Sequence, residues 1–132
     1  MKPPTHPLLL ILSTLATIPP TSQTVIDKPP NLAPQEACTL RTWSGTQCDG
    51  TNHAEYWYVA DEGCRSCRNN HGESHSFSLS GHCLTGTVLL WRTDECDADD
   101  DHDDENGIEF YDLGCFTVDP NTPWNSSQPC FK

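Results

Sequence analysis

The sequence predicts an all-β protein, a disulfide-rich sandwich of two similar four-stranded halves. Three observations support this fold class. The chain of 132 residues contains 8 cysteines, and an even number in a short secreted protein indicates a disulfide framework. Its apolar runs are short, alternating or aromatic-rich, as in strands. Two parts of the chain resemble each other with a period of about 48 residues.

The N-terminus is predicted to be a secretory signal peptide. The apolar run Leu8–Leu15 is followed by small and turn-forming residues. It is shorter than the roughly 20 residues that a membrane-spanning helix requires. We expect cleavage between Ala16 and Gln23. The expected divisions are a signal peptide over residues 1–23, an extended Pro-rich segment over 24–37 and the folded domain over 38–132.

The two halves of the folded domain share landmarks in the same order. These are Trp43 and Trp91, Cys48 and Cys96, the segments EYWYVADEGC and EFYDLGC that end at Cys64 and Cys115, and serine-rich stretches before Cys83 and Cys130. Expected strands include Glu55–Val59, Ser74–Leu79 and Thr87–Trp91. Four antiparallel strands per half commonly close as a Greek key, in which the fourth strand lies beside the first.

The segment Trp43-SGTQCD-Gly50 resembles the start of a βγ-crystallin-like motif. This family, which includes microbial killer-toxin and protease-inhibitor relatives, begins each Greek key with an aromatic residue, six spacer residues and a glycine. The resemblance extends over residues 38–130. It implies a folded first hairpin, with the glycine at positive φ, that a serine of the fourth strand ties down. That serine is Ser76 or Ser78 in the first half.

In the second half, the resemblance assigns the same role to Ser126 or Ser127. This half departs from the motif, because Ala98 stands where the glycine is expected. Asn69-Asn70 also lacks the following hydroxyl that the family's calcium sites use, so we expect no metal and no cofactor. The cysteine-rich, signal-led format also looks like fungal small secreted proteins, including effector candidates.

The expected disulfides are Cys48–Cys64, Cys96–Cys115, Cys38–Cys83 and Cys67–Cys130. The first two follow from the repeat, since equivalent cysteines in equivalent halves are expected to pair alike. The third follows from the Greek key, whose last strand ends near the start of its first. The fourth is implied by the resemblance, because in that fold the third strand crosses to the other half. The Cys64-x-x-Cys67 pattern is accordingly interpreted as structural rather than redox-active or zinc-binding.

An acidic run is the most conspicuous local feature. It contains Asp97, Asp99, Asp100, Asp101, Asp103, Asp104 and Glu105. Six residues separate Cys48 from Glu55, but twelve separate Cys96 from Glu109, so the run is predicted to be an inserted loop. It is a solvated loop, a weak cation site or a possible interaction loop for a basic partner. It does not fit an EF-hand, whose glycine position is occupied here by His102.

Composition excludes several functions. The formal net charge of −12 disfavours nucleic acid, which requires a basic face, and anionic membranes. No recognised catalytic motif occurs, and we expect no catalytic residue. His71, His75 and His82 lie close in sequence but are interpreted as structural. Asn125 begins an N-glycosylation sequon.

The sequence therefore predicts a secreted, extracellular, non-enzymatic interaction protein, effector or toxin-like. We expect a monomer whose partner is an extracellular protein or cell-surface target, with no stable membrane insertion. One alternative is a secreted protease inhibitor that presents a disulfide-stapled loop. A third class is a small hydrolase, since Asp61-Glu62 and Asp94-Glu95 are paired acids.

Overall fold

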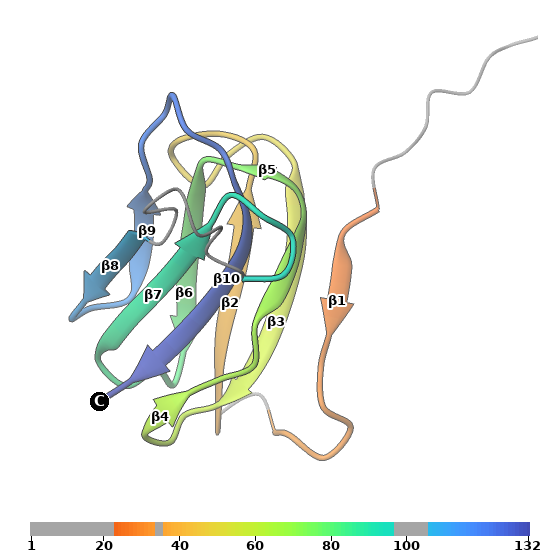
Figure 1. Ribbon diagram of the computed structural model, residues 1–132. Helices are drawn as coiled ribbons and strands as arrows, with labels where there is room; N and C mark the ends of the chain where they lie inside the picture. Colours follow the sequence, from red (N-terminus) through yellow and green to blue (C-terminus); the bar gives the residue numbers. More distant parts are fainter. Residues whose placement is uncertain (1–22, 34–35, 97–105) are drawn as a thin grey trace, which may run out of the picture.

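The computed structural model describes residues 23–33, 36–96 and 106–132, which form two facing β-sheets (Figure 1). The strands are β1 (Val25–Asp27), β2 (Ala37–Trp43), β3 (Asn52–Val59), β4 (Gly63–Cys64), β5 (Arg68–Ser74), β6 (Ser76–Gly81), β7 (Gly86–Trp91), β8 (Asn106–Phe110), β9 (Gly114–Thr117) and β10 (Trp124–Phe131). No α-helix occurs among the described residues. The predicted all-β, disulfide-rich sandwich is therefore confirmed.

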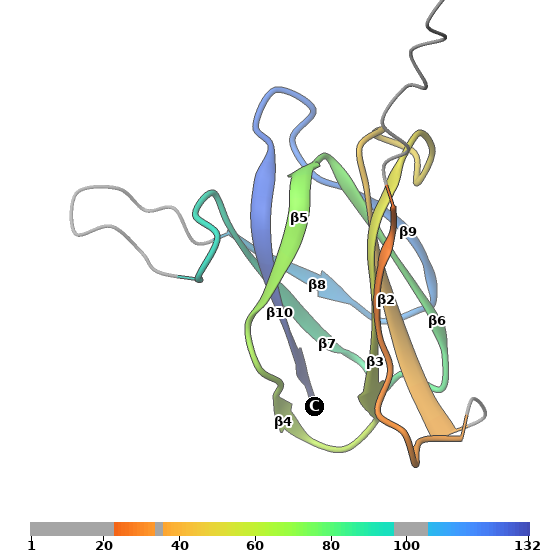
Figure 2. The same ribbon diagram turned by 90° about the vertical axis from the view of Figure 1, so that its right-hand side faces the viewer.

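The first sheet has the strand order β1-β3-β2-β6-β9. The second has the order β4-β10-β7-β8, and β5 also pairs with β10. The pairing is antiparallel except between β1 and β3, which run parallel. Figure 2 shows β5, β10, β7 and β8 on one side of the molecule and β3, β2 and β6 on the other.

Side chains alternate between the core and the outer faces, as the strand geometry requires. In β3, Ala54, Tyr56 and Tyr58 are buried between the sheets, whereas Glu55 and Trp57 lie on the outer face and are half-buried. Because of this alternation, one face of the sheet packs on the apolar core while the other is exposed to solvent.

Aromatic rings hold the two sheets together. Phe77 of the first sheet is buried and stacks on Phe116, with ring centroids 5.1 Å apart. Phe110 of the second sheet meets Phe116 and Phe131 edge to face, at 6.2 Å in each case. Full burial of each such ring contributes about 1.5–3 kcal/mol. The core therefore depends on residues from both halves.

The two halves exchange their third strands. In each half the fourth strand returns beside the first: β6 pairs with β2, and β10 pairs with β7. The third strands lie in the opposite sheets, where β5 pairs with β10 and β9 pairs with β6. Each half thus completes the other's sheet, and neither half has a complete set of strand neighbours alone.

The predicted landmarks occupy the expected places with one exception. Trp43 faces Ser76 across the strands, and Trp91 faces Ser126, so the two tryptophans are structural counterparts. Gly50 has φ 75°, as predicted for the glycine at the hairpin bend. The single strand expected over Ser74–Leu79 is wrong, because the chain bends there and divides it between β5 and β6.

The structure corrects three of the four predicted disulfides. Its bridges are Cys38–Cys83, Cys48–Cys115, Cys64–Cys130 and Cys67–Cys96. Cys38–Cys83 is confirmed, whereas Cys48–Cys64, Cys96–Cys115 and Cys67–Cys130 are wrong. The exchange of third strands is the physical reason, because it carries Cys115 to the hairpin of the first half and Cys67 to the hairpin of the second.

The registers show which cysteines are counterparts. Cys115 of β9 faces Ser78 of β6. Arg68, which follows Cys67, faces Ser127 of β10. Cys67 and Cys115 therefore occupy equivalent positions at the start of the two third strands. The bridges to Cys48 and Cys96 are related by the same pseudo-symmetry, and both join one half to the other.

Two short strands were not predicted. β4 lies beside the end of β10, where Cys64 faces its disulfide partner Cys130. β1 belongs to the segment expected to be an extended tether, and it pairs with the outer edge of β3. Part of the expected tether is therefore a strand that is bound to the domain.

Candidate interaction surface

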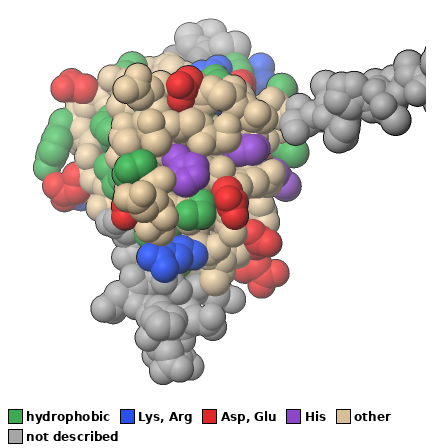
Figure 3. Space-filling view, turned by 90° about the horizontal axis from the view of Figure 1, so that it is seen from above, with side chains coloured by type: hydrophobic (Ala, Val, Ile, Leu, Met, Phe, Trp, Pro, Cys, Tyr) green, Lys and Arg blue, Asp and Glu red, His purple; other side chains and the backbone are tan. Residues whose placement is uncertain are grey.

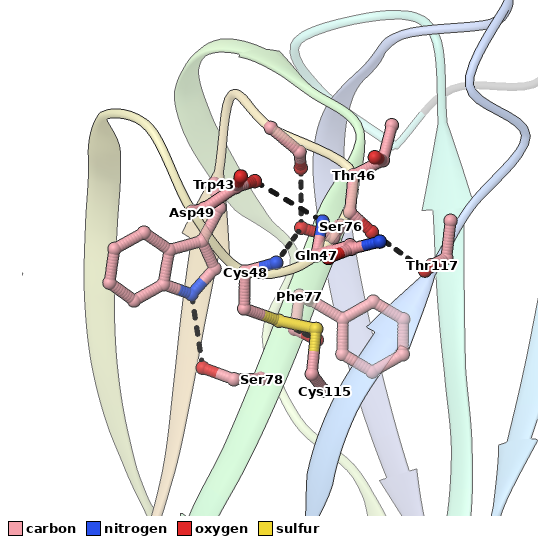
Figure 4. Close-up of a disulfide and its surroundings, with 11 residues drawn as sticks. Trp43, Thr46, Gln47, Cys48, Asp49, Ser76, Phe77, Ser78, Cys115 and Thr117 are labelled. Atoms are coloured by element: carbon pink, nitrogen blue, oxygen red, sulfur yellow. Dashed lines mark hydrogen bonds between the residues drawn. A yellow bond between two sulfur atoms is a disulfide. The ribbon is translucent and has the colours of Figure 1, made fainter.

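Two serines hold the hairpins against the sheets. Ser76 Oγ accepts a hydrogen bond from the Cys48 N–H at 2.9 Å and donates one to the Gly45 carbonyl at 2.6 Å (Figure 4). In the second half, Ser126 Oγ accepts from the Cys96 N–H at 3.0 Å. Both cysteines have positive φ, 53° and 55°. Ser76 and Ser126 are thus the tie-down serines that the resemblance implied.

The alternative serines have other partners. Ser78 accepts a hydrogen bond from the Trp43 indole at 3.0 Å (Figure 4). Ser127 is buried and donates to Asn70 Oδ1 at 2.9 Å. These groups are satisfied within the fold, so they position elements rather than face a ligand.

The connection between β8 and β9 presents two apolar side chains to solvent. Tyr111 is 71% exposed and Leu113 is 52% exposed. We call residues Tyr111, Asp112 and Leu113 the Tyr111 tip. Exposed aromatic and aliphatic side chains that project together are typical anchors of protein interfaces, because each fills a pocket of a partner.

The Tyr111 tip is held at both ends. On one side, Phe110 is buried in the core. On the other side, Cys115 is bridged to Cys48 of the first hairpin. A short connection between such anchors loses little conformational entropy when it binds, which favours affinity.

A shallow pocket lies beside the tip. Its volume is about 150 Å³, and its lining comprises Cys83, Leu84, Phe110, Tyr111, Asp112 and Leu113. Cys83 is bridged to Cys38, so this wall of the pocket is also disulfide-anchored. The exposed side chains of the Tyr111 tip lie beside the pocket, so a complementary protein surface can contact both.

Electrostatic contacts orient the tyrosine. Tyr111 donates from its hydroxyl to Glu109 Oε2 at 2.7 Å, and Lys132 contacts Glu109 Oε1 at 3.3 Å. The pKa of Glu109 is lowered mainly by the hydrogen bond from Tyr111 and next by the hydrogen bond from Lys132. The same bond raises the pKa of Tyr111. The ring is thus held by a carboxylate that stays ionised at neutral pH.

A second group of polar and aromatic residues lies on the outer face of the first sheet. Glu55 joins Trp57 and Arg41, since its two oxygens accept from the Trp57 indole and the Arg41 Nε at 2.7 Å each. Arg41 also donates to Ser80 Oγ at 2.9 Å. The network fixes the Trp57 ring in place without a ligand.

Histidine side chains lie near one another on one face (Figure 3), but among the described residues they form no metal site. The His82 N–H donates to the Ala37 carbonyl, at the start of β2. The His53 imidazole instead packs against Gly72, next to His71. Figure 3 shows histidine side chains together on the upper face. Among residues 23–33, 36–96 and 106–132, no three His, Cys, Asp or Glu side chains are grouped to hold a metal.

The acidic run lies entirely outside the described residues. Asp97, Asp99, Asp100, Asp101, Asp103, Asp104 and Glu105 all fall in the segment 97–105. Their predicted role as a possible interaction loop stays a prediction. The predicted signal peptide, apart from Gln23, lies outside the described residues as well. In the described part of the chain, no helix is long and apolar enough to cross a membrane.

The side chain of Asn125 is engaged within the fold. Its Nδ2 donates to the Arg92 carbonyl at 2.8 Å, and the next two residues of the sequon, Ser126 and Ser127, are buried. A glycan on Asn125 would replace this hydrogen bond. Glycosylation stays a prediction. Asp61, one of the paired acids, forms an ion pair with Arg65 at 2.5 Å.

Sequence reasoning missed the Tyr111 tip. The signal was present, because YDLG places two large apolar residues in a short connection directly before a cysteine. No protein-family model, curated protein or solved structure matches this chain.

Proposed function

We propose that the protein is a secreted, non-enzymatic interaction protein, effector or toxin-like, that acts on an extracellular target. The exposure of Tyr111 and Leu113 on a disulfide-anchored connection carries this proposal. Interface hot spots are enriched in tyrosine, and a rigid presentation favours binding. The partner is a protein or cell-surface molecule with an apolar pocket, and the interaction protein is a monomer.

We also propose that each half is a Greek key of the crystallin type. Three features support this proposal. The fourth strand of each half lies beside the first. Gly50 has the positive φ of the family bend. Ser76 and Ser126 tie down equivalent hairpins. The resemblance to killer-toxin relatives accords with the proposed activity.

Secretion is supported by the disulfides. All 8 cysteines are paired in four bridges. Disulfides persist in oxidising, extracellular environments and are rare in the cytosol. A domain of this size is typically extracellular when it has so many bridges. The proposed route is the predicted N-terminal signal peptide.

The test is capture of a partner by the oxidised mature protein from extracellular material. A Tyr111→Ser/Leu113→Ser variant is expected to lose about tenfold or more in affinity, the scale of a hot-spot truncation. Val59→Ser removes from β3 an apolar side chain about as exposed as Leu113 and serves as the control. Equal capture by both variants and the wild-type protein would refute a role for the tip.

A protease inhibitor is the second candidate, because the tip is short, exposed and stapled by Cys48–Cys115. The protein should then inhibit a protease that cleaves after tyrosine or leucine, and Tyr111→Ser should abolish inhibition. Rapid cleavage at the tip without inhibition rules this candidate out. Turnover of a polysaccharide or ester by the wild-type protein would instead favour the third class, a small hydrolase.

A further inference from the structure

The outer edge of β3 is occupied by the chain's own N-terminal strand. β1 pairs parallel to β3, with Val25, Ile26 and Asp27 facing Ala54, Glu55 and Tyr56. Figures 1 and 2 show β1 running along the outside of the sandwich beside β3. The side chains of Val25 and Ile26 are 37% and 64% exposed, and neither belongs to the core cluster. Burial of apolar surface therefore contributes little to holding β1.

Three polar contacts fix the register of this strand. Thr24 Oγ1 donates to the Asn52 carbonyl at 2.7 Å, Asp27 forms an ion pair with Arg68 at 2.8 Å, and the Lys28 ammonium lies 4.4 Å from the centre of the Trp57 ring. A hydroxyl, an acid and a base are thus recognised at fixed spacing along an extended backbone.

The receptor groups are held in place by residues outside β1. Glu55 accepts the indole N–H of Trp57 at 2.7 Å, which fixes the ring that receives the ammonium. Arg68 lies 5.6 Å from the centre of the Tyr56 ring, which orients the guanidinium that receives the acid. The site is therefore pre-organised for a peptide, and pre-organisation favours binding.

Release of β1 from the edge of β3 would not disturb the core. Pro29-Pro30 follows one residue after β1, and proline cannot donate to a strand ladder, so the pairing does not continue past this point. The Asp27 and Arg68 side chains are 44% and 41% exposed, so water can replace their ion pair.

We propose that the β3 edge is a peptide-binding site. Its ligand is an extended segment of an extracellular partner protein that displaces β1 and carries an acid followed directly by a base. Main-chain hydrogen bonds of strand addition give affinity, and side chains give specificity. The acid is complementary to Arg68, and the base is complementary to the Trp57 face. This site is separate from the Tyr111 tip and does not rest on it.

The test uses the full mature chain and a peptide of its own sequence, acetyl-Thr-Val-Ile-Asp-Lys-amide, as the probe. An Asp27→Ala/Lys28→Ala variant weakens β1, so the peptide should bind it about tenfold more tightly than the wild-type protein, whose edge is occupied. NMR titration is expected to show saturable shifts of the amides of residues 52–57 and of the Trp57 indole.

The controls separate specific recognition from general effects. A Glu109→Ala/Lys132→Ala variant removes an exposed acid and base elsewhere and should bind like wild type. A peptide with Asn and Gln in place of Asp and Lys should bind about tenfold more weakly. Absence of saturable shifts in the weakened variant, or equal binding of both peptides, would overturn the proposal. So would exchange of β1 between two copies of the chain without peptide binding.

Discussion

At the scale of single residues, buried hydroxyl groups organise the two hairpins. Ser76 and Ser126 are fully buried and accept hydrogen bonds from cysteine N–H groups that have positive φ. A backbone N–H that is buried without a partner costs about 1–3 kcal/mol. Each serine is therefore required by the hairpin that it holds, whatever the protein binds.

This requirement predicts the effect of serine truncation. Ser76→Ala is expected to lower the free energy of unfolding by about 1–3 kcal/mol, because it removes two hydrogen bonds. Ser126→Ala is expected to destabilise on the same scale, because it leaves the buried Cys96 N–H without the Ser126 Oγ acceptor. Urea denaturation of the oxidised proteins measures both. Ser66→Ala, at an exposed position, should stay within about 0.5 kcal/mol of wild type. A smaller loss for Ser76→Ala than for Ser66→Ala would contradict the assignment.

Sequence reasoning located these serines to within two residues but missed the Tyr111 tip. The serines follow from a motif in which the hairpin must be tied to the fourth strand. Exposure of Tyr111 depends on where β8 ends and how β9 turns away, which are tertiary properties. A large apolar residue in a strand-like run is read as buried, so the position of these two residues in a short connection was overlooked.

At the scale of elements, the contact of β3 with the exchanged strand β5 is a seam between the sheets. Tyr56 donates a hydrogen bond from its hydroxyl to the Asn69 carbonyl, and Arg68 lies over its ring. Burial raises the pKa of Tyr56 to about 12, against the opposing effect of Arg68. Burial likewise raises the pKa of Tyr58.

The seam predicts coupled ionisation and unfolding at high pH. A raised pKa means that the folded state holds the phenolic proton more tightly than the unfolded chain does, whose tyrosines ionise near pH 10. The resulting stability is complete below about pH 10 and is lost as pH rises through about 12 for Tyr56. Tyrosinate absorbance of Tyr56 and Tyr58 should therefore appear together with loss of the β-sheet signal in circular dichroism.

Tyr58→Phe provides the matching control for this titration. It removes one group that must ionise on unfolding, so the alkaline midpoint should move to higher pH. Ionisation of Tyr56 and Tyr58 near pH 10 with an intact sheet signal would show that the seam is open to water.

The strand pairings show why the sequence repeat misaligned the second strands of the two halves. Thr39 faces Trp57 in the first half, and Thr87 faces Glu109 in the second. Trp57 and Glu109 are therefore counterparts, whereas the sequence alignment matched Glu55 with Glu109. The slip is two residues. Because side chains in a strand alternate with period two, a slip of two preserves the buried and exposed pattern and cannot be detected from it.

At the scale of the whole molecule, the halves are interlocked rather than stacked. Three of the four disulfides join one half to the other: Cys48–Cys115, Cys64–Cys130 and Cys67–Cys96. Equivalent cysteines do pair alike, as expected from the repeat. The predicted partners were wrong because each third strand lies in the other half's sheet, so the two symmetry-related bridges join the halves instead of lying within them.

Disulfide mapping tests this interlocked arrangement most directly. Trypsin and cleavage before aspartate, applied without reduction, separate the relevant cysteines from one another. We predict that Ser66–Arg68 is recovered joined to Asp94–Cys96, and Thr42–Cys48 joined to Asp112–Val118. Recovery of Cys48 joined to Cys64, or of Cys96 joined to Cys115, would show that each half closes on itself and would contradict the exchange of third strands.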